Sequence, residues 1–219
     1  MKFSIITIFP DLIKDYCNES ILERAQKQHL IDVNAMNLRN FATDKHKTVD
    51  DSPYGGGPGM VMRPDVIASA LASLGVLKKN GERRKEKKRR VILLSPRGKQ
   101  FTQGVAEEFA KLEELVMISG RYEGIDQRVH DKMIDEEISI GPYVLAGGEL
   151  GALVILEAVA RNIPSVLGNE ESLLEETTSS AKEYPQYTRP EIFNKWKVPD
   201  ILLGGHHKNI QEWRRKMQK

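Results

Sequence analysis

Short apolar runs alternate with helix-like segments along most of the chain, and this alternation restricts the fold more than any other feature. The runs of strand length are residues 3–9, 31–38, 91–94, 115–119, 137–140 and 143–145. The segments with helical spacing, length or start signals are residues 12–30, 64–74, 102–112, 125–133 and 150–160. Strands that alternate with helices predict a parallel sheet with helices on both faces, so we assign the chain to the α/β class.

Three turns that contain glycine follow strand-like runs, at residues 95–98, 120–126 and 139–148. Glycine lets the backbone bend sharply and approach a ligand closely. Ligands of parallel sheets bind beyond the carboxyl ends of the strands, which is where all three turns fall. We therefore expect one composite binding site. Residues 39–63 are polar and rich in glycine, which predicts a long functional loop.

The composition is that of an ordinary globular protein, because 40% of the 219 residues are hydrophobic and 29% are charged. A single cysteine, Cys17, permits no internal disulfide, which fits a reducing compartment. No apolar run is long enough to span a bilayer. The apolar start stops at Pro10-Asp11 without a cleavage site, so it indicates a first strand and not a signal peptide. We expect a cytoplasmic protein that does not associate with membranes.

The character of the sequence changes after residue 164. Residues 170–183 are acidic and rich in Ser and Thr, which favours a linker or a mobile loop. Residues 184–219 contain both tryptophans and a basic helix candidate that starts at Lys208. We predict a main domain over residues 1–165, a flexible linker over 166–185 and a small C-terminal domain over 186–219.

Positive charge is concentrated in one segment. Residues 78–90 contain nine Lys or Arg and two Glu, a local charge of +7, whereas the whole chain carries only +2. Such a cluster is either a contact for phosphate groups or a solvated loop. It contains no aromatic residue that could stack on a base.

Several common sites are not indicated. The glycine-rich residues 55–59 follow a polar run and lack the Gly-Lys-Ser/Thr ending of a phosphate-binding loop. His46 is far in sequence from His206-His207, and none of them has cysteine partners at zinc spacing, so we expect no protein metal site.

Five strings in one order resemble the bacterial tRNA (guanine-N1)-methyltransferases, the TrmD family. They are Asp50-Asp51 with residues 53–60, Leu94-Ser95-Pro96, Gly120-Arg121-Tyr122-Glu123-Gly124-Ile125-Asp126, Ser139-Ile140-Gly141 with residues 143–150, and Tyr187-Thr188-Arg189-Pro190. Each string alone is weak, but together they cover nearly the whole chain. The resemblance is poor in residues 78–90 and 170–183.

This resemblance implies a SPOUT methyltransferase domain with a trefoil-knotted cofactor site, followed by a small helical C-terminal domain. The chain ends near a helix that the family usually extends, so we expect this second domain to be shortened. The resemblance also implies a homodimer with its active site at the subunit interface, S-adenosylmethionine as methyl donor, and tRNA as partner. The acceptor would be N1 of the guanosine just 3′ of the anticodon. The resemblance is also compatible with a role for Mg²⁺ in catalysis.

By the same resemblance, the donor pocket would be formed by the three glycine turns and the strand ends that precede them. Its residues would be Leu93, Leu94, Ser95, Pro96, Gly120, Arg121, Tyr122, Glu123, Gly124, Ile138, Ser139, Ile140, Gly141, Tyr143, Leu145, Gly147 and Gly148. Backbone groups of the bent loops would bind the adenine edge, and Glu123 would accept hydrogen bonds from ribose hydroxyls.

Methylation at guanine N1 makes a clear chemical demand. N1 carries a proton at neutral pH, so a general base must remove it, and the charge that builds on O6 needs a cation or donors. The resemblance implies Arg161 for O6; by itself, Arg161 would be an ordinary charge at a helix C-terminus. The family's aspartate base corresponds to Glu176, whose carboxylate is displaced by about an ångström. Glu175 is the alternative base, and an acidic loop without a catalytic role is the third interpretation.

The substrate RNA would contact the long loop. The resemblance implies His46, Asp50, Tyr54, Gly55 and Gly59 as contacts there, with Arg189 near the C-terminus. Lys195, Lys197, Arg214 and Arg215 are either further phosphate contacts or ordinary solvated surface.

Three functions stay open from the sequence. The first is a tRNA (guanine-N1)-methyltransferase. The second is a homologue that binds tRNA and the donor but is catalytically impaired. The third is a SPOUT methyltransferase that acts on another RNA base.

Overall fold

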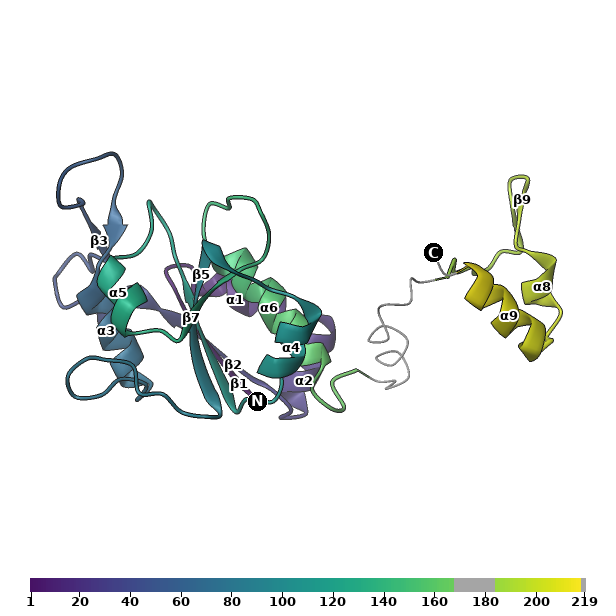
Figure 1. Cartoon of the computed structure of the whole chain (residues 1–219), viewed down its shortest axis with the longest axis horizontal. Helices are drawn as coiled ribbons and strands as arrows, with labels where there is room; N and C mark the ends of the chain where they lie inside the picture. The colour runs from purple at the N-terminus through teal and green to yellow at the C-terminus, as the bar shows by residue number, and fades with distance from the viewer. Residues whose placement is uncertain (168–183, 218–219) are drawn as a thin grey trace. The chain divides into compact units, whose positions relative to one another are not determined.

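The computed structural model describes residues 1–167 and 184–217, and the chain forms two compact units, Met1–Gly168 and Asn169–Lys219 (Figure 1). The first unit contains a five-stranded parallel sheet with the strand order β2-β1-β6-β5-β7. Its strands are β1 (Lys2–Thr7), β2 (Asp32–Asn37), β5 (Arg89–Gln100), β6 (Glu114–Ser119) and β7 (Glu136–Ser139). The predicted parallel α/β sheet is confirmed.

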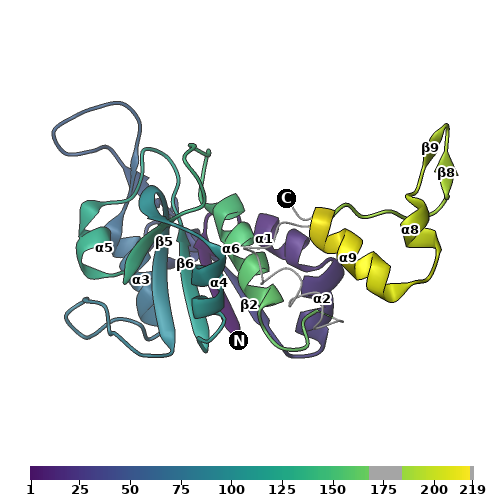
Figure 2. The same ribbon diagram turned by 45° about the vertical axis from the view of Figure 1, so that its right-hand side comes forward.

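Both faces of the sheet are apolar, because successive side chains of its central strands join two different clusters. Phe3 and Ile5 of β1 belong to one buried cluster and Ile6 to the other. Met117 and Ile118 of β6 divide in the same way. The first cluster is covered by α1 (Pro10–Cys17), α2 (Ser20–Lys27), α4 (Gln103–Phe109) and α6 (Glu149–Arg161). The second is covered by η1 (Leu38–Phe41), α3 (Pro64–Ser73) and α5 (Gln127–Lys132), and Figures 1 and 2 show the two groups of helices on opposite sides.

The pairing of β5 with β7 contains the first glycine turn. Leu94 and Lys99 both pair with Ile138, so residues 95–98 loop out of the sheet between them. A Cβ on Gly98 would lie 2.5 Å from the backbone carbon of Glu137, so the close approach of the two strands requires glycine here. The predicted turn is therefore an irregularity within a longer strand.

Three predicted elements were wrong. The expected helix over residues 12–30 is two helices, because Asn18 ends α1 and Ser20 has a left-handed φ of 54°. Residues 143–145 do not form a strand, because the Tyr143 hydroxyl bends back to donate to the carbonyl of Ile140 at 3.2 Å. Residues 39–63 are not structureless, since they include most of η1 and the antiparallel pair β3 (Asp50–Asp51) and β4 (Val61–Met62).

In the second unit, the described residues 184–217 form a hairpin and two helices. Strands β8 (Ile192–Phe193) and β9 (Trp196–Lys197) are antiparallel, and α8 (Asp200–Leu203) and α9 (His207–Met217) follow them. The rings of Tyr187 and Trp213 have centroids 6.3 Å apart, and the guanidinium of Arg214 lies 4.6 Å from the centre of the Tyr184 ring. Aromatic contacts with α9 thus hold the segment that precedes the hairpin.

Candidate functional site

The loop within β5 and the loops that follow its neighbours β6 and β7 surround one cavity of about 1330 Å³. All the residues that the resemblance assigned to the donor pocket line it, namely residues 93–96, 120–124, 138–141, 143, 145, 147 and 148. The cavity is larger than the roughly 300–1,000 Å³ of ordinary small-molecule pockets. It therefore has room for a cofactor and for part of a second ligand.

A buried carboxylate fixes the wall of this cavity. Glu149, in the first turn of α6, is only 1% exposed. Arg121 approaches its Oε2 with Nε at 3.0 Å and Nη2 at 2.9 Å, and the Thr7 hydroxyl donates to its Oε1 at 2.7 Å. The Arg121 guanidinium also lies 4.7 Å from the centre of the Phe9 ring. The network connects the loop after β6 to the start of α6 and the end of β1.

Sequence reasoning missed Thr7 and the role of Glu149. A signal for Glu149 was present, because a glutamate between a glycine pair and an apolar helix is buried, and a buried glutamate needs a charged partner. No local signal identified Thr7, which is 142 residues away from Glu149 in sequence.

The loops of the wall touch each other through their backbones. The amide of Gly148 donates to the carbonyl of Gly120 at 2.9 Å, and a Cβ on Gly148 would lie 2.7 Å from the Cα of Ser119. Any side chain at this position would separate the two loops.

A His–Glu pair that the sequence did not suggest borders the cavity. The Nδ1 of His130 lies 2.6 Å from Oε1 of Glu137, and His130 is one of the lining residues. Burial raises the pKa of Glu137, but hydrogen bonds from His130 and Ser95 and the charge of Arg97 outweigh it, so the pKa ends below its ordinary value. Glu137 is therefore ionised at neutral pH.

The long loop is attached to the same wall. The amide of Met62 donates to the carbonyl of Gly124 at 2.9 Å, and the amide of Glu123 donates to that of Met60 at 3.0 Å. Tyr122 has a left-handed φ of 58°, and burial together with the adjacent Asp50 carboxylate raises the pKa of its hydroxyl.

The structure brings only some of the predicted RNA contacts to the cavity. Tyr54 lines it and is fully exposed, and Gly59 packs so closely on Glu123 that a Cβ would lie 2.4 Å from its Cγ. His46 and Gly55 are exposed and are not among the lining residues, and Arg189 is exposed in the second unit.

The catalytic candidates are not at the cavity of the described chain. Arg161 is the last residue of α6, whose first turn borders the cavity, and 12 steps of about 1.5 Å place it roughly 18 Å further along the helix. Glu175 and Glu176 lie outside the described residues.

The candidates for further phosphate contacts differ in their surroundings. Lys195 and Arg215 are exposed, Lys197 is paired with Asp200 at 2.6 Å, and Arg214 packs on the Tyr184 ring. Across residues 1–167 and 184–217, no cluster of three or more His, Cys, Asp or Glu could hold a metal ion. In the same two ranges, no helix is long and apolar enough to cross a membrane.

The family model described as "tRNA (Guanine-1)-methyltransferase TrmD" matches residues 1–219. A protein of Ruminiclostridium cellulolyticum named tRNA (guanine-N(1)-)-methyltransferase is 50% identical over 217 residues, which is 98% of this chain and 89% of that protein. Proteins with the same name from Dictyoglomus turgidum and Desulfitobacterium hafniense are 50% and 48% identical over 99% of this chain and 84% and 79% of theirs. The chain therefore belongs to the TrmD family of tRNA (guanine-1)-methyltransferases.

Proposed function

We propose that this protein transfers a methyl group from S-adenosylmethionine to N1 of the guanosine just 3′ of a tRNA anticodon. The observation that carries the proposal is that the three glycine turns converge on one cavity. The names of the relatives at about 50% identity support the reaction and the substrate class.

The cavity fits the donor. Six glycines between Gly120 and Gly151 leave parts of its wall as bare backbone, which suits the edge of an adenine ring, and the exposed carboxylate of Glu123 can accept hydrogen bonds from ribose hydroxyls. S-adenosylmethionine, when bound, supplies a methyl group activated by a positively charged sulfur. A trefoil-knotted passage of the chain at this point belongs to the proposal.

The chain's own residues prepare the acceptor nitrogen. The carboxylate of Glu176, or of Glu175, takes the proton from guanine N1, which leaves a lone pair for attack on the methyl group. The Arg161 guanidinium donates hydrogen bonds to O6, where negative charge develops. The long loop and the C-terminal unit hold the tRNA.

An exposed apolar surface supports a homodimer. Leu12 and Tyr16 lie four residues apart on α1, and Leu150 and Val154 lie four residues apart on the adjoining helix α6, all with about half or more of their surface exposed. A second copy of the chain seated on this surface would border the cavity, because Leu150 follows the first residue of α6. A second copy would also supply the Arg161 that lies too far away within one chain.

Val154→Asp is expected to convert the dimer to a monomer and to abolish methyl transfer, because it buries an unpaired charge in the interface. Sedimentation equilibrium measures the change in mass. Ala72→Asp, at an exposed apolar position of α3 on the other face of the sheet, is the matched control and should leave the mass unchanged. A Val154→Asp protein that stays dimeric would place the interface elsewhere.

Mass spectrometry of nucleosides tests the reaction itself. An unmodified tRNA transcript with guanosine 3′ of its anticodon is incubated with the protein and labelled S-adenosylmethionine, with Mg²⁺ or with a chelator. N1-methylguanosine at that nucleotide is the expected product. Donor binding without any product would instead identify an impaired homologue, and a different modified nucleoside would identify another target base.

A further inference from the structure

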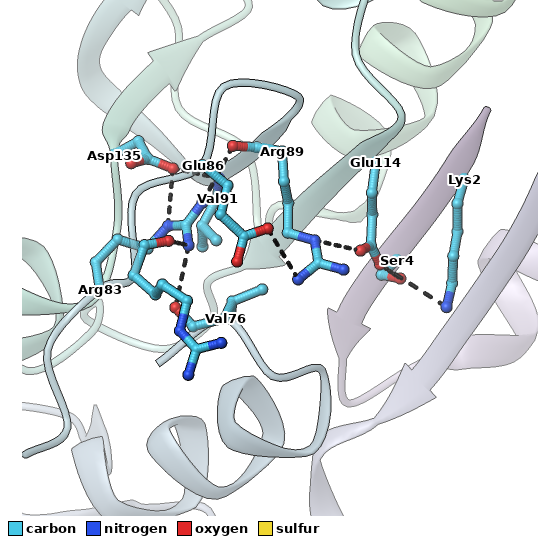
Figure 3. Close-up of polar contacts among 10 residues, drawn as sticks. Lys2, Ser4, Val76, Arg83, Glu86, Arg89, Val91, Glu114 and Asp135 are labelled. Carbon is cyan, nitrogen blue, oxygen red and sulfur yellow. Dashed lines mark hydrogen bonds and ion pairs between the residues drawn. The ribbon is translucent and has the colours of Figure 1, made fainter. Parts of the chain in front are cut away.

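The basic segment of residues 78–90 is folded against the rest of the first unit (Figure 3). It contains two turns, one closed by the amide of Lys78, which donates to the carbonyl of Glu82 at 2.8 Å, and one closed by a bridge between Glu86 and Arg89. The amide of Arg84 donates to the carbonyl of Val76 at 2.8 Å, so the segment returns to the end of the stretch that precedes it.

Arg83 holds the two turns together from inside. Its side chain is only 3% exposed, and its Nε lies 2.9 Å from Oδ2 of Asp135. Its Nη1 donates to the carbonyl of Val76 at 3.0 Å and its Nη2 to that of Arg89 at 3.1 Å, as Figure 3 shows. The same Asp135 oxygen accepts the amide of Val91 at 2.8 Å, so Arg83 also connects the segment to β5.

Arg89 is a second paired cation, with a partly buried side chain. Its Nε lies 2.7 Å from Oε2 of Glu114, a largely buried carboxylate that also accepts the Ser4 hydroxyl at 2.8 Å. Its Nη1 lies 3.5 Å from Glu86. The positive charges of Arg83 and Arg89 are thus neutralised within the fold, and they do not belong to the outer surface of the segment.

Four other cations project from the two turns into solvent. Lys79, Arg84, Lys85 and Lys87 are exposed, and none of their side chains makes an ion pair or hydrogen bond with the described part of the chain. Lys78 and Lys88 have exposed partners, Glu82 at 3.4 Å and Glu113 at 2.5 Å, and such pairs contribute little in water. Arg83 and Arg89 therefore stabilise the two turns through internal contacts, whereas at least four cations of the segment have no partner in the described chain.

The segment lies at the end of the sheet opposite to the cavity. Its four unpartnered cations precede the first residue of β5, Arg89, whereas the cavity begins at Leu93, four strand residues or about 13 Å further along. A ligand that fills the cavity does not reach these cations. An RNA much longer than one nucleotide would extend that far.

We propose that Lys79, Arg84, Lys85 and Lys87 form a second contact surface for the phosphate backbone of the RNA substrate, away from the base that is modified. The proposal rests on the proposed function. When exposed cations without partners contact the phosphates, they displace the counterions that are condensed on the RNA. This release adds affinity that does not depend on the RNA sequence. The segment has no aromatic residue for base stacking, so it contacts backbone and does not read bases.

An acidic lipid surface fits this segment less well than RNA. The two apolar residues that precede the segment, Val76 and Leu77, are buried, so no apolar side chain next to the two turns can enter a bilayer. Binding of the purified protein to vesicles with and without phosphatidylserine provides a direct comparison. Tighter binding to the acidic vesicles than to tRNA at the same salt concentration would overturn the proposal.

The test changes all four cations to glutamine, as Lys79→Gln, Arg84→Gln, Lys85→Gln and Lys87→Gln in one protein. Binding of a tRNA transcript is measured from 50 to 200 mM salt, together with KM for tRNA and the single-turnover rate at saturating tRNA. The logarithm of the affinity falls as the logarithm of the salt concentration rises. Loss of four phosphate contacts should make this slope shallower by about three. Between 50 and 200 mM salt, the factor by which the affinity falls should be roughly 50- to 150-fold smaller for the variant than for the parent. The KM for tRNA should rise, and the rate at saturating tRNA should stay unchanged.

A double variant provides a matched comparison. Lys85→Gln with Lys87→Gln should change the slope by about half as much, and Lys27→Gln with Lys111→Gln, which removes the same charge from exposed sites on other elements, should not change it. Equal slopes for the parent and the four-site variant would overturn the proposal. If the parent itself neither binds nor methylates tRNA, the proposed function fails first, and the two failures are thereby distinguished.

Discussion

Arg83→Met is expected to lower the free energy of unfolding of the first unit by about 3–5 kcal/mol. The substitution removes one partner of a buried ion pair and leaves Asp135 charged with only the Val91 amide as a donor. It also removes the donors to the carbonyls of Val76 and Arg89. Urea unfolding should be followed by far-UV circular dichroism, because both tryptophans lie in the C-terminal unit and their fluorescence would not report on this domain.

Arg84→Met is the matched control, because Arg84 is adjacent in sequence and its exposed side chain has no partner in the described chain. It should change the unfolding free energy by less than about 0.5 kcal/mol. Adding Asp135→Asn to Arg83→Met removes the orphaned charge but keeps an acceptor for the Val91 amide. The double variant should therefore lose less than the sum of the two single variants. Additive losses would show that the pair does not act as a unit.

The period of the hydrophobic pattern was sufficient to predict most of the sheet and its helices. In β6, residues on both faces are apolar, as expected for a strand covered on both sides, and the start and end of the prediction are within one residue. The break between α1 and α2 was missed because the apolar spacing continues across it. The backbone of residues 18–20 marks it, where Asn18 ends α1 and Ser20 is left-handed, and that is a property of the folded chain.

At the site too, features that depend on neighbouring residues could be predicted from the sequence, whereas contacts between residues far apart in sequence could not. Glycine turns after strands are local, so the three loops around the cavity could be predicted from their positions alone. The long-range contacts could not, because the hydrogen-bonded pair Thr7 and Glu149 at the cavity is 142 residues apart, and the ion pair Arg83–Asp135 of the basic segment is 52 residues apart. Residues 78–90 were undecided between a solvated loop and a phosphate contact, since the sequence does not show which cations are buried.

Glu176→Ala is expected to lower the single-turnover rate of methyl transfer by about 100- to 10,000-fold, which is the usual contribution of a general base. The affinity for S-adenosylmethionine should be nearly unchanged, because the residue acts on the proton at guanine N1 and not on the donor. Quench-flow with saturating protein and labelled donor measures the rate, and calorimetry with S-adenosylmethionine alone measures the affinity.

Glu175→Ala is the matched control, since the two glutamates are adjacent and have the same charge. If Glu176 is the base, only its alanine variant loses the rate, and Glu176→Asp retains most of it because aspartate is the residue that the resemblance places at this position. If the losses are reversed, the segment is one residue short before the base and Glu175 takes the proton. Normal rates for both alanine variants would assign the proton to a carboxylate outside this segment, and the resemblance would then have misplaced the base.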